Sequence, residues 1–245
     1  MANLEFCDTH NQVAFLEKPE GSQEFHQIVD FLNTAHIRYA LTVNPTIYVS
    51  QIKQFWQTVT TNTFENGDKE LIATVDGRKI TITEASVRRH LHLADENGIS
   101  SLPNTEIFHH LSRMGYDTSS QILTFQKGCF DPQWRFFIHT ILHCLSPKKT
   151  AWEQFSSNIA TALICLATNR TFNFSKLIFD GMVKNVDNKY KFLMYPRFIQ
   201  TVLNIRKSLL LSHKNVYPTP CFTQKLFSNM SMASKGFNGD SSSTF

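Results

Sequence analysis

The sequence predicts a mainly α-helical protein with a minor β component: a compact multi-helix domain with a small β-hairpin near residues 70–82 and a disordered C-terminal tail. Three observations favour this fold class. Hydrophobic residues make up 42% of the chain, with 21 phenylalanines against 9 glycines, which is enough apolar material for a packed core. Apolar residues recur at helical spacing along most segments. Two short β-type segments flank Asp76-Gly77, a dipeptide typical of a tight hairpin turn.

The N-terminal part predicts two helices. Ser22 is a suitable N-cap, and the apolar spacing that follows it predicts a helix over residues 22–37. Proline is tolerated in a first helical turn, so Asn44-Pro45 is expected to open a second helix that reaches about residue 59.

The hairpin is expected to lead directly into a helix. Its strands should cover residues 71–75 and 79–82. Either Thr81 or Thr83 can cap the following helix, which is expected to end near residue 93.

The middle of the chain predicts a short helix, a strand and a long helix. Thr105 is expected to cap the short helix, and Gly115 to close it in a left-handed conformation. Residues 122–125 are expected to form a strand. Asp131-Pro132 is typical of a helix start, and this helix should run to Ser146-Pro147.

The last third predicts three more helices and one strand. Thr150 is expected to cap a helix that reaches residue 166, and Asn173 to cap the next helix. Residues 189–195 alternate enough to form a strand, and Pro196 should open a last helix that ends near residue 210.

These elements imply one domain between two irregular ends. We expect an irregular arm over residues 1–20 and a single helical domain over 21–211, which could also consist of two lobes at 21–115 and 120–211. The proline and serine content from residue 212 onward predicts an extended or disordered tail over 212–245.

The C-terminal third is basic, whereas the N-terminal part is acidic. Residues 1–70 hold nine acidic and four basic residues, and residues 184–225 hold eight basic residues against Asp187 alone. Such asymmetry points to a polyanionic partner, so the candidate nucleic-acid-binding residues are Lys184, Lys189, Lys191, Arg197, Arg206, Lys207 and Lys214. Tyr190, Tyr195 and Phe198 lie among them and could stack on bases. The alternative is that these aromatic residues are core and the cations point to solvent.

The sequence favours a non-catalytic protein without cofactor or metal. His139 and His143 lie four residues apart on a predicted helix, but Thr140 occupies the position of the glutamate in a zincin motif, and the companions are core residues. Phosphate-binding glycine loops and nucleophile-elbow motifs are absent from the sequence. The acidic pair Asp95-Glu96 is expected to lie solvated in a turn.

Cysteine usage and hydropathy predict an intracellular protein, in the cytoplasm or the nucleus. The five cysteines are odd in number and form no C-x-x-C pair, which favours a reducing compartment. The first residues do not resemble a signal peptide, and the most apolar runs, 136–145 and 159–167, are too short to span a bilayer, so no membrane association is expected.

Several longer stretches resemble one family of polyproteins. The resemblance is carried by Val59-Thr-Thr-Asn-Thr-Phe-Glu-Asn-Gly67, by residues 70–83 and 85–98, and by Phe130-Asp-Pro-Gln-Trp-Arg-Phe-Phe-Ile-His139. It continues in Phe172-Asn-Phe-Ser-Lys-Leu-Ile-Phe-Asp180 and in Tyr195-Pro-Arg-Phe198. Together these residues resemble a region of plant LTR-retrotransposon polyproteins of the gypsy type. The hairpin that leads into a capped helix also resembles, more distantly, the plant mobile domain.

The resemblance implies a structural or interaction module of a retroelement, with self-association or a host protein as its partner. It brings no catalytic residue with it, because the protease, reverse transcriptase and integrase lie in other regions of such polyproteins. Since those polyproteins continue beyond the matching region, the resemblance also implies a fragment or a degenerate gene product. The alternative function is nucleic-acid binding through the basic segment 184–225.

Overall fold

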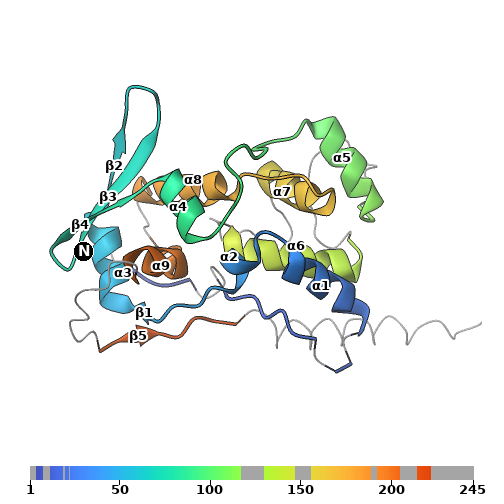
Figure 1. Cartoon of the computed structure of the whole chain (residues 1–245), viewed down its shortest axis with the longest axis horizontal. Coiled ribbons are helices and arrows are strands. Elements are labelled where there is room, and N and C mark those ends of the chain that lie inside the picture. The colour runs from blue at the N-terminus through green and yellow to red at the C-terminus, as the bar shows by residue number, and fades with distance from the viewer. Residues whose placement is uncertain are drawn as a thin grey trace, which may run out of the picture.

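The structure is a computed structural model, and it confirms a mainly helical fold with small antiparallel sheets (Figure 1). It describes residues 4–7, 12–18, 20–21, 23–116, 130–146, 156–188, 192–204 and 214–221. Ser22, the predicted strand at 122–125 and the predicted cap Thr150 lie outside these residues.

The N-terminal helices are shorter than the sequence predicts. A 3-10 turn, η1 (Gln23–Phe25), precedes α1 (His26–Thr34), and a separate short helix, α2 (Arg38–Thr42), follows it. The helix expected at Pro45 begins later, as α3 (Val49–Thr58), because Ile47 and Tyr48 form strand β1 instead.

The hairpin is confirmed, and it has a third strand that the sequence pattern did not indicate. Strands β3 (Lys69–Val75) and β4 (Arg78–Ile82) pair in a register that sets Val75 opposite Arg78. Asp76 and Gly77 have φ values of 50° and 72°, so both take the left-handed conformation of a two-residue turn. Strand β2 (Thr60–Thr63) pairs with β3. Its Thr and Asn side chains are mostly exposed, so it lacks the alternation that identifies a half-buried strand.

Of the two candidate caps after the hairpin, Thr83 begins helix α4 (Glu84–His90). The Thr83 hydroxyl accepts from the Ser86 backbone N–H at 3.1 Å, and the Ser86 hydroxyl accepts from the Thr83 N–H at 2.8 Å. Two backbone N–H groups that have no acceptor within the helix are thereby hydrogen-bonded, in the arrangement called a capping box.

Five further helices lie in the described part of the chain: α5 (Asn104–Arg113), α6 (Pro132–Leu145), α7 (Ser157–Ala167), α8 (Phe174–Val186) and α9 (Pro196–Asn204). The predicted cap Asn173 accepts from the Lys176 N–H at 2.8 Å, and Gly115 has a φ of 85° after α5. Pro103, not Thr105, is the N-cap of α5. The predicted strand at 189–195 is wrong in its described part, because residues 192–195 form no strand.

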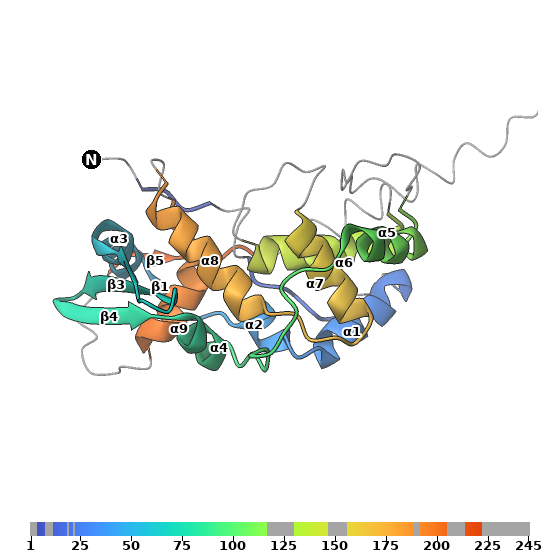
Figure 2. The same cartoon turned by 90° about the horizontal axis from the view of Figure 1, so that it is seen from above.

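The two halves of the chain share one core. In Figures 1 and 2 the β2-β3-β4 sheet lies at one end of the long axis and α5 near the other, with α8 running between them. Helix α4 packs against α8 and α9, α2 against α6, and α5 against α7. The buried apolar residues form a single cluster that includes Trp56, Phe136 and Phe174.

The segment placed in the predicted tail contributes a strand. Strand β5 (Val216–Tyr217) pairs antiparallel with β1, and Val13 forms a bridge with Cys221. The rings of Phe6 and Tyr217 stack with centroids 4.0 Å apart. Residues near both ends of the chain therefore pack together along the edge drawn at the bottom of Figure 1. None of the described helices has the length and apolar character needed to cross a membrane.

Candidate functional site

The structure describes three of the seven predicted nucleic-acid-binding residues. Lys184, on α8, and Lys214, before β5, are both exposed. Lys189, Lys191, Arg206 and Lys207, together with Tyr190, lie outside the described residues. Arg197 is completely buried in α9, so its inclusion among nucleic-acid contacts was wrong.

Arg197 is buried because its guanidinium joins three backbone segments. It donates to the carbonyls of Ala40 at 3.2 Å, Val43 at 2.6 Å and Cys144 at 3.1 Å. These carbonyls belong to α2, its C-cap and α6, so the side chain ties α9 to the N-terminal helices. Burial lowers the pKa of Arg197 to about 10. The guanidinium is enclosed by these three carbonyls and cannot reach a phosphate.

The aromatic residues next to Arg197 are also core. Tyr195 and Phe198 are each 1% exposed, and their rings stack with centroids 5.6 Å apart. The Arg197 Cζ lies 4.9 Å from the centre of the Phe198 ring. For these two aromatic residues the core alternative was correct, and neither can stack on a base.

Asp95 is a second charged residue whose environment differs from the prediction. It is completely buried instead of solvated, and Glu96 beside it is exposed. One Asp95 oxygen accepts from Arg88 Nε at 2.8 Å and from the Ser175 hydroxyl at 2.7 Å, and the other accepts from the Ser175 N–H at 2.7 Å. The carboxylate therefore lies at the N-terminus of α8, where the helix dipole favours negative charge, and links it to α4.

The residues considered for reactive chemistry are set in the core or at its edge. His139 and His143 stack on α6 with ring centroids 5.6 Å apart. Among the residues that the structure covers, no three His, Cys, Asp or Glu side chains gather to hold a metal ion. Burial raises the pKa of the Cys144 thiol to about 12, against a smaller lowering by Arg197, so the thiol stays neutral at physiological pH.

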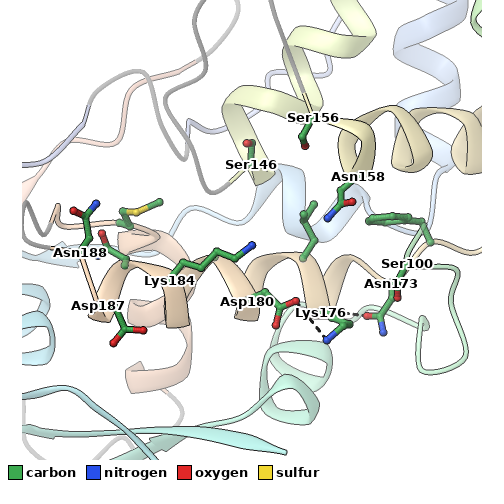
Figure 3. Close-up of a pocket in the computed structure, with 15 residues that line it drawn as sticks. Ser100, Ser146, Ser156, Asn158, Asn173, Lys176, Asp180, Lys184, Asp187 and Asn188 are labelled. Atoms are coloured by element: carbon green, nitrogen blue, oxygen red, sulfur yellow. Dashed lines mark hydrogen bonds and ion pairs between the residues drawn. The ribbon is translucent and has the colours of Figure 1, made fainter. Parts of the chain in front are cut away.

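The structure instead places polar side chains along a groove on one side of α8 (Figure 3). Its volume is about 540 Å³. One row of α8 residues, Lys176, Asp180 and Lys184, is spaced by four and so lies on one helix face. Ser146 at the end of α6, with Ser156 and Asn158 at the start of α7, forms the facing wall.

The charges that line the groove balance. Its lining holds two lysines, Lys176 and Lys184, and two aspartates, Asp180 and Asp187. Lys176 Nζ lies 3.4 Å from Asp180 Oδ2, and both side chains are nearly half exposed. In Figure 3 the Lys184 side chain and the Asn158 amide both extend into the space between α8 and the facing wall. Outside this ion pair, the groove therefore offers one cation, Lys184, one anion, Asp187, and several neutral hydrogen-bonding groups, not a basic patch.

Asn185 is the most constrained residue of this lining. It is only 3% exposed, and its Nδ2 donates to the Phe192 carbonyl at 2.9 Å. Its Oδ1 is buried and has no hydrogen-bond partner among the described residues. Because this oxygen has no contact with solvent, a ligand in the groove cannot reach it, and its missing donor costs free energy within the fold itself.

Sequence reasoning identified only part of this groove. Lys184 was a candidate residue and Asn173 was a predicted cap, but Asn158 and Asn185 have no local sequence signal. The serines at the ends of α6 and α7 meet α8 only through the packing of the helices. A four-residue spacing of polar residues on α8 was the one signal that could have indicated a polar helix face.

Comparisons with protein-family models, with curated proteins and with solved structures gave no match for this chain.

Proposed function

We propose that this chain is a non-catalytic interaction module, derived from a plant retrotransposon polyprotein, whose α8 groove binds an extended segment of a partner protein. The observation that carries the proposal is a groove of about 540 Å³ whose lining combines Lys184 with amide and hydroxyl groups that both donate and accept hydrogen bonds. An extended peptide presents N–H and C=O groups along its length, and these match the amide and hydroxyl groups of the lining.

The other lining groups suit the same ligand. The Asn158 amide can both donate to and accept from a peptide backbone, and the serine hydroxyls can do the same. Lys184 favours a segment with an acidic side chain at the matching position. Because two lysines are balanced by two aspartates, the groove suits a polypeptide better than a polyanion.

A non-catalytic role is consistent with how the described charged residues are used. Arg197 and Asp95 are buried and bonded to groups that hold the fold together. The Cys144 thiol is kept neutral by burial, so it is a poor nucleophile. These side chains stabilise helix packing and do not face a shared cavity.

Selection from a peptide library displayed on phage tests the groove directly. The affinity of a selected peptide for the full chain is measured by calorimetry, for the wild type and for two groove variants, Lys184→Glu and Asn158→Ala. We expect about a tenfold loss for Lys184→Glu, since reversal of a charge opposite a carboxylate costs on the order of 1–2 kcal/mol.

Lys214→Glu provides the matched control, because Lys214 is also an exposed lysine but lies outside the groove. Its affinity should equal that of the wild type. Selected peptides that bind all three variants equally well would refute the groove as the interaction site.

Light scattering after size-exclusion chromatography identifies the source of the peptide. If the partner is a second copy, the molar mass should rise with concentration for the wild type and less so for Lys184→Glu. A strict monomer at high concentration would exclude self-association and leave a host protein as the partner.

A further inference from the structure

A second cavity, of about 800 Å³, lies among α2, β4, α4 and α9. Its polar and aromatic lining includes Tyr39, Asn44, Arg89, His90, His92 and Asn204. No carboxylate is present in the described part of this lining. The cavity is within the size range of small-molecule sites and separate from the α8 groove.

Two exposed rings stack face to face at this cavity. The rings of Tyr39 and His92 stack with centroids 4.1 Å apart and planes 11° from parallel. Tyr39 is 37% exposed, and His92 is exposed as well. A planar ligand such as a nucleic-acid base can extend such a stack at its outer face.

His92 is held in this position by an unfavourable backbone conformation. It follows the last turn of α4 with a φ of 54°, and the Leu93 N–H donates to the Arg88 carbonyl at 2.9 Å. This is the hydrogen bond of a Schellman cap, in which glycine usually occupies the left-handed position. A histidine there costs stability, and such outliers concentrate at functional sites.

The same helix turn supplies cationic and hydrogen-bonding groups. Arg88 forms ion pairs with Glu84 and Asp95, whereas Arg89 is exposed and has no carboxylate partner among the described residues. The His90 Nδ1 lies 2.5 Å from the Ser86 carbonyl, which can only accept, so Nδ1 carries the proton. Nε2 of the fixed ring is then the nitrogen that can meet a ligand.

From these features we infer that the cavity binds a nucleoside phosphate unit of a single-stranded nucleic acid. The base extends the Tyr39–His92 stack, the phosphate meets Arg89, and the side-chain amides of Asn44 and Asn204 offer hydrogen bonds to the base edge. The cation at this site is Arg89, not one of the cations of the basic segment 184–225, and the inference stands independently of the peptide groove.

Fluorescence anisotropy of a labelled 12-nucleotide single strand, as RNA and as DNA, tests the inference with the full chain at low salt. Tyr39→Ala should weaken binding about 5- to 150-fold, which corresponds to about 1–3 kcal/mol for one stacked base. Tyr39→Phe should retain the affinity. Phe64→Ala removes another exposed ring, which lies just after β2 and outside the cavity, and should change nothing.

Two further pairs of variants separate binding from stability. Arg89→Gln should lower the salt dependence of log K by about 0.7, the value for one phosphate contact on a single strand, whereas Arg113→Gln on α5 should not. His92→Gly should raise the thermal midpoint but weaken binding. Asn169→Gly, at another left-handed position with φ 54°, should leave binding unchanged.

Competition experiments identify the form of the ligand. If only an unlabelled single strand displaces the probe, the ligand of the cavity is a nucleic-acid strand. If micromolar AMP also displaces the probe, the ligand of the cavity is a free nucleotide. Equal affinity of the wild type, Tyr39→Ala and Arg89→Gln would overturn the inference. So would loss of binding in Lys184→Gln and Lys214→Gln alone, which would place the nucleic acid on the basic segment, or undetectable binding at low salt.

Discussion

The role of Arg197 can be tested at the scale of one residue. Arg197→Met keeps an apolar chain of similar length but removes every donor to the carbonyls of Ala40, Val43 and Cys144. Each buried carbonyl left without a donor costs about 1–3 kcal/mol, so we expect the free energy of unfolding to fall by at least about 3 kcal/mol. Urea denaturation followed by circular dichroism measures this change.

Lys184→Met makes the same replacement of a cation at an exposed site and should change the free energy of unfolding by less than about 0.5 kcal/mol. An Arg197→Met variant that is as stable as the wild type but binds nucleic acid less tightly would restore Arg197 to the basic surface.

At the scale of elements, Asp95 is the link between α4 and α8. Asp95→Ala leaves Arg88, whose side chain is 16% exposed, with Glu84 alone, and removes the acceptor from the first turn of α8. Removing one partner of a buried ion pair typically costs about 3–5 kcal/mol, and we expect a loss of stability in that range. Thermal and urea unfolding of the purified variant measure it.

Glu96 is the natural control, because it is the exposed neighbour of Asp95. Glu96→Ala is expected to unfold at the same urea concentration as the wild type. If both alanine variants had equal stability, the Asp95 contacts would contribute nothing, and the turn would behave as the solvated one that the sequence predicts.

At the scale of the whole molecule, the packing predicts one cooperative unit instead of two lobes. Helices from residues 21–115 and 120–211 pack against one another, α2 with α6, α3 with α9, α4 with α8 and α9, and α5 with α7, and the buried apolar residues form one cluster. Separating the halves would expose that cluster, so we expect a single unfolding transition. Trp56 and Trp134 lie in different halves, so tryptophan fluorescence reports on the unfolding of both. Its midpoint should equal the midpoint measured by circular dichroism. Two resolved transitions would favour separate lobes.

Local sequence determined the elements whose causes are local. The Asp76-Gly77 turn, the Thr83 capping box and the Asn173 cap each depend on residues within a few positions, and the structure contains all three. The helical spacing of apolar residues likewise predicted the fold class. Strand β2 was missed because its exposed Thr and Asn side chains carry no alternating pattern; it exists because it pairs with β3.

Tertiary structure alone decided which polar residues are buried and which meet at a site. Arg197 and Asp95 are charged residues of the kind usually found at the surface, but both are buried. The hydrogen-bond partners of Arg197 are 53 to 157 positions away in the sequence, and those of Asp95 are 7 to 80 positions away. Asn158 and Asn185 meet in one groove only because α7 packs beside α8. A sequence pattern records the neighbours along the chain, whereas burial and convergence depend on neighbours in space, and for this protein those come from opposite halves of the chain.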